Sequence, residues 1–174
     1  MIRLLTGSTH TGKTLLAQRL LERHGAPYLS IDHLKMGLIR SGMCPLTPES
    51  TDEALTAVLW PVVREIVKTA VENGQSLTVE GCYIPFNWRE DFDASCLPHI
   101  RFLCLVFSEA YIRTRFDAIQ THANAIERRK DDSFCTMELL LAENRRNLEA
   151  CRRRGLPYYL IDCLLYTSDA ADEL

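Results

Sequence analysis

Eight consecutive residues near the amino end combine two glycines, a lysine and a threonine at a fixed spacing. These residues are Gly7, Ser8, Thr9, His10, Thr11, Gly12, Lys13 and Thr14. In this pattern the backbone N–H groups form a nest for anions, the lysine is a point charge for phosphate oxygens, and the hydroxyl is a ligand for Mg²⁺. The spacing therefore predicts a site for the phosphates of a nucleoside triphosphate, with Lys13 also a catalytic residue and Thr14 a metal ligand.

Two carboxylates follow later strand-like stretches of the chain. Asp32 comes at the end of the first stretch, where it is placed to act as a general base on an acceptor hydroxyl and to bind the acceptor. Glu80 ends the second stretch and is followed by Gly81, so it is a candidate for Mg²⁺ or its water shell and for the acceptor. Structural roles are the alternatives: helix capping for Asp32, and capping or a surface ion pair for Glu80.

Two basic side chains follow Asp32 on a predicted helix over 33–40. Lys35 and Arg40 are candidates to bind a phosphate or carboxylate of the acceptor, because both carry a permanent positive charge at neutral pH. Ordinary solvated surface charge is the alternative for each.

Arginines also flank and occupy a polar segment near 121–134, which we predict to be a helical lid. Phosphoryl transfer needs positive charge on the transferring group, and a closing segment commonly supplies it as arginine. We take Arg115 and Arg128 as candidate catalytic residues. The sequence alone does not separate them from Arg113 and Arg129.

The elements that must position these residues alternate between strand and helix. Apolar stretches predict strands at 2–6, 27–31, 76–79, 100–107 and 157–161. Helical spacing of apolar residues predicts helices at 13–23, 33–40, 51–73, 109–119 and 136–154. Pro61 marks a point where the third helix could kink. Because parallel neighbours need a crossover connection, the order predicts a parallel sheet with helices on both faces and ligands at the carboxyl ends of the strands.

Composition limits the class of protein. A chain of 174 residues that is 47% hydrophobic and 25% charged fits one globular domain. No apolar run approaches the ~20 residues needed to span a bilayer, so we expect a cytoplasmic protein with no membrane partner. The seven cysteines form no Cys-x-x-Cys pair, and several lie in apolar stretches, which favours buried free thiols over disulfides or zinc.

The carboxyl end differs in character from the rest. The run CLLYTSDAADE over 163–173 resembles translated transposase-adapter DNA, and we expect residues 163–174 to be a non-native tail after a single domain over 1–162. Without the three acids of this tail, 20 basic residues balance 20 acidic ones. The chain then has no basic excess of the kind that nucleic-acid binding requires. Its oligomeric state cannot be read from the sequence.

Taken together, the motifs resemble those of P-loop small-molecule kinases of the adenylate kinase-like group over roughly residues 1–162. The resemblance implies a P-loop NTPase fold, a three-layer α/β/α sandwich with a five-stranded parallel sheet and a helical lid, and ATP with Mg²⁺ as cofactors. Asp32 with Lys35 is similar to the Asp-x-x-Arg of nucleoside monophosphate kinases, with lysine in place of arginine. Glu80 with Gly81 stands where those kinases have Asp-Gly-x-Pro-Arg.

Other parts of the pattern resemble different members of the group. Phe86 follows Pro85 where the second arginine of the monophosphate kinases is expected. The run from Glu80 to Pro85 is more similar to the Glu-Gly segment of 2-phosphoglycerate kinase-like proteins, and Asp32 to the acceptor-side aspartate of zeta-toxin-like kinases.

This resemblance implies an ATP-dependent phosphotransferase for a small metabolite with a hydroxyl or phosphate acceptor, such as a 2-phosphoglycerate-like compound. A nucleoside monophosphate kinase is the alternative enzyme. A nucleotide-binding regulatory switch with slow hydrolysis is the alternative from another class. Aromatic side chains would shape the acceptor pocket; they are Trp60, Tyr83, Phe86 and Trp88.

Overall fold

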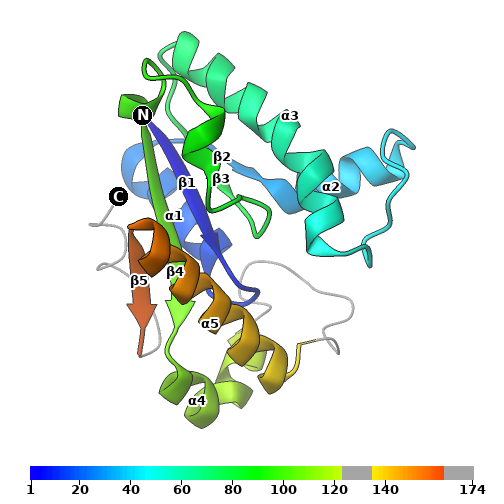
Figure 1. Cartoon of the computed structure of the whole chain (residues 1–174), viewed down its shortest axis with the longest axis vertical. Helices are drawn as coiled ribbons and strands as arrows, with labels where there is room; N and C mark the ends of the chain where they lie inside the picture. Colours follow the sequence, from blue (N-terminus) through cyan, green and yellow to red (C-terminus); the bar gives the residue numbers. More distant parts are fainter. Residues whose placement is uncertain (123–134, 163–174) are drawn as a thin grey trace.

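A five-stranded sheet lies at the centre of the computed structural model, which describes residues 1–122 and 135–162 (Figure 1). Its strands are β1 (Ile2–Gly7), β2 (Tyr28–Ser30), β3 (Leu77–Glu80), β4 (Ile100–Phe107) and β5 (Tyr158–Ile161). Their order in the sheet is β2-β3-β1-β4-β5, and every neighbouring pair is parallel. The predicted parallel sheet is therefore confirmed, with β1 at its centre.

Within the described ranges, five α-helices pack around this sheet. They are α1 (Lys13–His24), α2 (Ile31–Arg40), α3 (Asp52–Glu72), α4 (Glu109–His122) and α5 (Met137–Arg154), with short 3-10 turns η1 (Trp88–Asp91) and η2 (Leu97–His99). In Figure 1, α1 lies behind the sheet and α5 in front of it. Alternate β4 side chains enter two separate cores: Phe102 packs with the α3 core, whereas Leu103 packs with the core that includes α1 and α4. Three layers result.

Helix boundaries follow local chemistry. The hydroxyls of Thr51 and Thr136 accept hydrogen bonds from the backbone N–H three residues later, which caps α3 and α5. Helix α3 runs through Pro61 as one helix, so the kink considered there does not divide it. Among the described residues no helix is both long and apolar enough to cross a membrane. None of the six described cysteines forms a disulfide, and five of them are buried, as predicted.

One boundary differs from the prediction and affects the site. Asp32 does not end a strand; it lies in the first turn of α2, and Ser30 is the residue that precedes the helix. The edge strand β2 has three residues and pairs with β3, and Ser30 stands opposite Glu80 in that register. A helix-capping role for Asp32 is therefore wrong, because the residue is already inside the helix.

Candidate phosphate-binding site

The glycine-rich loop occupies the turn from β1 to α1 at the carboxyl edge of the sheet. Gly7 has a φ of 146°, and a Cβ added there would lie 2.4 Å from the carbonyl oxygen of Leu105 on β4. Gly12 is left-handed, with a φ of 82°, and precedes the first turn of α1, which contains no acidic residue. The loop therefore has the tight backbone and the positive helix end that an anion-binding turn needs.

Lys13 is the buried cation of this loop. Its side chain is 7% exposed, and its Nζ donates a hydrogen bond of 2.8 Å to the carbonyl of Ser8. Burial by itself would lower the pKa of Lys13, but the neighbouring acidic groups of Cys82, Glu80 and Asp32 outweigh burial and raise this pKa above its ordinary value. Lys13 therefore carries a full positive charge at neutral pH, at the first residue of α1.

Glu80 lies beside the loop at the end of β3. It is 1% exposed and stands between Leu5 of β1 and Ser30 of β2 in the sheet register. The next residue, Gly81, leaves no room for a side chain, because a Cβ there would lie 2.9 Å from the Cβ of Ile31. Burial excludes the surface ion pair considered for Glu80, and the carboxylate lies close enough to the Lys13 ammonium to raise the pKa of that lysine.

Asp32 and Lys35 form an ion pair on α2, with 2.6 Å between Oδ1 and Nζ. Lys35 also donates a 2.9 Å hydrogen bond to the Tyr83 hydroxyl and lies 5.0 Å from the centre of that ring. Burial lowers the pKa of Lys35, but Asp32 and Tyr83 outweigh it and raise the pKa. Burial raises the pKa of Tyr83 to about 12 against the opposing hydrogen bond from Lys35. Arg40, at the other end of α2, lies about 12 Å along the helix axis from Asp32 and is exposed.

The arginines assigned to a lid are only partly described. Arg115 is exposed and has non-helical backbone angles within α4, with φ −131° and ψ 20°, and no hydrogen bond or ion pair joins its side chain to another described residue. Arg113 pairs with Glu109 at 2.7 Å on the same helix. Arg128 lies outside the described residues, as does all of the proposed lid after residue 122. The catalytic roles of Arg115 and Arg128 stay predictions.

Most of the aromatic residues considered for an acceptor pocket belong to the core instead. Trp88 is 2% exposed and stacks on Phe102 with 5.9 Å between ring centres. Trp60 is 6% exposed, and its Nε1 donates a 2.8 Å hydrogen bond to Asp91. Tyr83 alone among these presents a polar group to Lys35 of the site.

The sequence interpretation missed a contact from α5. Asn144, which is buried, donates from Nδ2 to the Ser8 hydroxyl at 2.7 Å and accepts at Oδ1 from the Phe107 backbone N–H at 2.7 Å. It therefore joins the loop after β1 to the end of β4. The available signal was a polar residue on the buried stripe of a helix, four residues after Leu140.

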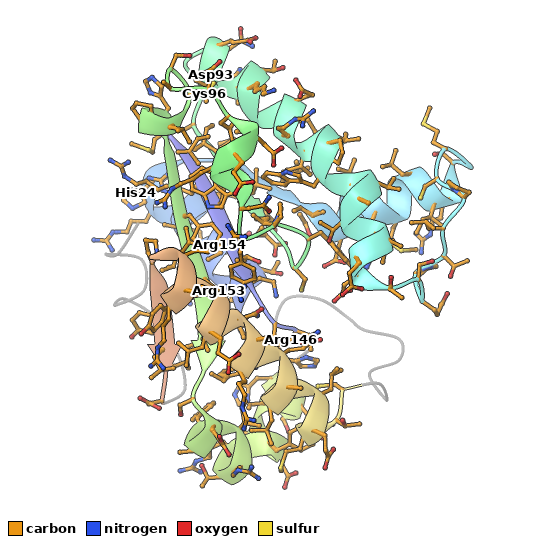
Figure 2. All side chains as sticks on the ribbon, in the orientation of Figure 1. His24, Asp93, Cys96, Arg146, Arg153 and Arg154 are labelled. Carbon is orange, nitrogen blue, oxygen red and sulfur yellow. The ribbon has the colours of Figure 1, made fainter. Side chains whose placement is uncertain are left out.

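Glu143 of α5 also meets the loop, and Asp52 at the start of α3 lies near Glu143. Burial and the nearby carboxylate of Asp52 raise the pKa of Glu143, although a hydrogen bond from the Thr9 backbone N–H opposes this. Arg146, one helical turn from Glu143, lowers the pKa of both carboxylates, and Figure 2 shows it projecting from α5 toward the space between this helix and α3. The spacing of Glu143 and Arg146 could have shown that they share a helix face, but not which loop they meet.

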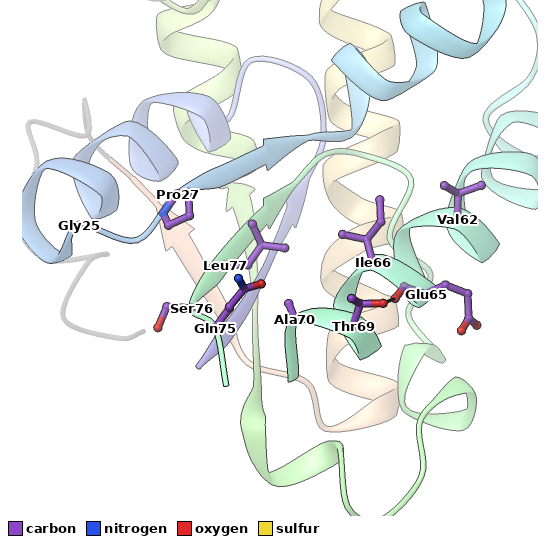
Figure 3. Close-up of a pocket in the computed structure, with 10 residues that line it drawn as sticks. All are labelled: Gly25, Pro27, Val62, Glu65, Ile66, Thr69, Ala70, Gln75, Ser76 and Leu77. Carbon is purple, nitrogen blue, oxygen red and sulfur yellow. Dashed lines mark hydrogen bonds between the residues drawn. The ribbon is translucent and has the colours of Figure 1, made fainter. Parts of the chain in front are cut away.

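A separate groove of about 740 Å³ lies away from this site (Figure 3). Pro27 and Leu77, near the amino ends of β2 and β3, line it together with Ile66 and Ala70 of α3. The phosphate loop lies at the carboxyl edge of the same sheet, so the groove is at the opposite edge and is no part of the loop.

Comparison with known proteins supports the fold rather than a family. No protein-family profile and no curated protein sequence matches the chain. Solved structures do. A gluconokinase from Sinorhizobium meliloti 1021 is similar with a TM-score of 0.53 and 17% identity, over 94% of this chain and 83% of that one. A deoxyadenosine kinase from M. mycoides has a TM-score of 0.53 and 10% identity, over 93% of this chain and 90% of that one. A shikimate kinase from Bacteroides thetaiotaomicron has a TM-score of 0.52 and 11% identity, over 92% of this chain and 85% of that one.

At these identities the similarity establishes the architecture. The chain has the three-layer α/β/α fold that these kinases share, as its parallel strand order already indicated. Which chemistry the site performs has to be argued from its own residues.

Proposed function

We propose that the protein is an ATP- and Mg²⁺-dependent phosphotransferase for a small metabolite with a hydroxyl or phosphate acceptor. The observation that carries this proposal is the buried Lys13 ammonium, held in a glycine-rich loop and close to two carboxylates, Glu80 at the end of β3 and Asp32 in the first turn of α2. A site for transfer needs both parts, a cradle for the phosphates and an acidic group for the acceptor.

The donor half of the site would be formed by the loop. Its backbone N–H groups and Lys13 would bind the β- and γ-phosphates of ATP. The residues present also fit Mg²⁺, because a hydroxyl from Thr14 in the first turn of α1 and the buried carboxylate of Glu80 are oxygen ligands of the kind it prefers. Bound there, Mg²⁺ would supply positive charge to the phosphate oxygens.

The acceptor half would be formed by α2 and the residues after β3. Asp32, whose side chain is 43% exposed, would take the proton of an acceptor hydroxyl as its oxygen attacks the γ-phosphorus and the bond to the β–γ bridging oxygen breaks. Lys35 would hold an anionic group of the acceptor, which favours a phosphate- or carboxylate-bearing substrate such as a 2-phosphoglycerate-like compound. Arg115 and Arg128 are proposed to neutralise charge on the transferring group, and Arg40 to assist acceptor binding.

The proposal is tested by ATP consumption with Mg²⁺ across phosphoglycerates, nucleoside monophosphates, sugars and amino alcohols. Lys13→Ala should abolish acceptor-dependent turnover, whereas Lys68→Ala, on the α3 surface, should not. Asp32→Asn should keep ATP binding and lose turnover, with Asp117→Asn on exposed α4 as its control. Turnover with a nucleoside monophosphate alone would favour that alternative kinase. ATP binding that no acceptor converts to turnover would favour a regulatory switch instead.

A further inference from the structure

We propose that Asn144 of α5 is a positioning residue that fixes the phosphate loop through Ser8 and thereby sets the affinity for the nucleoside triphosphate. The inference rests on the proposed function and assigns a role within it to a helix far from the loop in sequence. It concerns binding of the donor, and not the identity of the acceptor.

The side-chain amide of Asn144 makes three hydrogen bonds, two from Nδ2 and one at Oδ1. The side chain is 3% exposed, and Nδ2 donates to the Ser8 hydroxyl at 2.7 Å and to the Leu140 carbonyl at 2.8 Å. Oδ1 accepts from the Phe107 backbone N–H at 2.7 Å. A backbone N–H can only donate and a carbonyl can only accept, so the amide has one allowed orientation. The Ser8 oxygen therefore accepts from Asn144, and its own proton is left to donate elsewhere.

Two other side chains of the loop donate hydrogen bonds to Ser8. Its carbonyl accepts hydrogen bonds from Lys13 Nζ at 2.8 Å and from Thr11 Oγ1 at 2.9 Å. Ser8 is itself 3% exposed. A shift of Ser8 would therefore move both the ammonium and a second loop residue, which changes the convergence of donors that an anion nest requires.

Packing alone does not explain an asparagine at position 144, or its hydrogen bond to Ser8. A buried amide is costly unless it is hydrogen-bonded, and an apolar residue would fill this place on α5 without that requirement. Two of the three bonds of Asn144 join α5 to its own turn and to β4, whereas the third reaches the loop. The preceding residue, Glu143, meets the loop too, through the Thr9 backbone N–H. Helix α5 thus contacts two successive loop residues.

The test is a double-mutant cycle on ATP affinity, measured by titration calorimetry with Mg²⁺ on the full chain. Asn144→Ala is expected to weaken ATP binding about tenfold and to leave the KM for the acceptor unchanged. In the Ser8→Ala background the same change should have little further effect, because its partner is already gone. Asn147→Ala, on the same helix, is the matched control and should bind ATP as the wild type does.

The cycle separates positioning from a purely structural role. Asn144→Ala also leaves the Phe107 N–H without its side-chain acceptor, so a lower melting temperature is expected. Ser8→Ala keeps that bond and removes only the loop contact, which makes it the second variant if Asn144→Ala folds poorly; it should weaken ATP binding by itself.

Three results would overturn the inference. The first is an Asn144→Ala variant that binds ATP as tightly as the wild type. The second is an Asn144→Ala change that weakens ATP binding as much in the Ser8→Ala background as in the wild type. The third is a Ser8→Ala variant with unchanged ATP affinity. Wild-type protein that does not bind ATP would instead contradict the proposed function, and the inference with it.

Discussion

Replacement of Gly7 by alanine tests the geometry of the phosphate loop most directly. The new Cβ would lie 2.4 Å from the Leu105 carbonyl oxygen and 2.9 Å from Thr11 Oγ1, about 1 Å inside ordinary contact with the carbonyl. Gly7 and Leu105 are paired between β1 and β4, so relief requires the central strands to separate. Strain at the positive φ costs ~1–3 kcal/mol, and overpacking costs a further ~1–3 kcal/mol.

Gly7→Ala should therefore lower the free energy of unfolding by roughly 2–6 kcal/mol, and the melting temperature by roughly 4–24 °C. ATP binding should be lost together with this stability, because the displaced strand end begins the loop. Denaturant unfolding and calorimetric ATP titration measure the two effects.

Replacement of a second glycine, Gly37, by alanine should change the free energy of unfolding in the opposite direction. Gly37 lies within α2, where an added Cβ meets nothing within 4 Å, so Gly37→Ala should stabilise the protein by ~0.5–1 kcal/mol. The reasoning is refuted if Gly7→Ala unfolds like the wild type and binds ATP as tightly, or if the two variants change stability in the same direction.

Three further changes have definite directions. Lys35→Met should raise the acceptor KM about tenfold at unchanged ATP affinity, because the ammonium beside Asp32 is lost; an unchanged KM would remove Lys35 from the acceptor site. Burial raises the pKa of Glu143, so the folded state holds that proton more tightly than the unfolded chain, and ionisation at neutral pH costs stability. Glu143→Gln should thus have a larger free energy of unfolding than the wild type in urea at neutral pH. This difference should shrink once the pH falls below the raised folded-state pKa and disappear below the pKa of the unfolded chain. A difference that grows in acid contradicts this sign. Asp91→Ala removes the acceptor of the Trp60 N–H and should cost roughly 1–3 kcal/mol of unfolding free energy without altering ATP affinity, so weaker ATP binding would argue that this contact reaches the site.

Much of the fold could be predicted because its signals are local. Strand β4 is apolar along almost its whole length, as a strand covered on both faces must be, and its predicted bounds of 100–107 agree with the structure. Thr51 and Thr136 mark helix starts through their own hydroxyls. Strand β2 was overestimated because its end is set by a distant contact, where Gly81 lets Ile31 pack against β3 and α2 begin at once.

In the candidate site too, contacts between residues close in sequence could be predicted, whereas contacts between distant residues could not. The loop residues are contiguous, so their pattern could be read directly, and Lys35 lies one helical turn from Asp32, within reach of its carboxylate. Tyr83 comes 48 residues after Lys35, and its hydroxyl meets that ammonium only because β2 and β3 are neighbours. The order of strands in the sheet, rather than any spacing in the sequence, decides which residues after β3 lie close to Asp32 and Lys35.

Asn144 shows how far a sequence argument can go before the fold is needed. It lies on the buried stripe of α5 with Leu140 and Cys151, and a polar side chain on such a stripe must have partners, because an unpaired buried amide is costly. The sequence thus predicts that partners exist. It cannot name Ser8, which is 136 residues away, because that contact requires β1 and β4 to end side by side beneath the helix. The parallel pairing of those two central strands brings Ser8 and Phe107 to one amide, and so joins a core position of α5 to the candidate phosphate-binding loop.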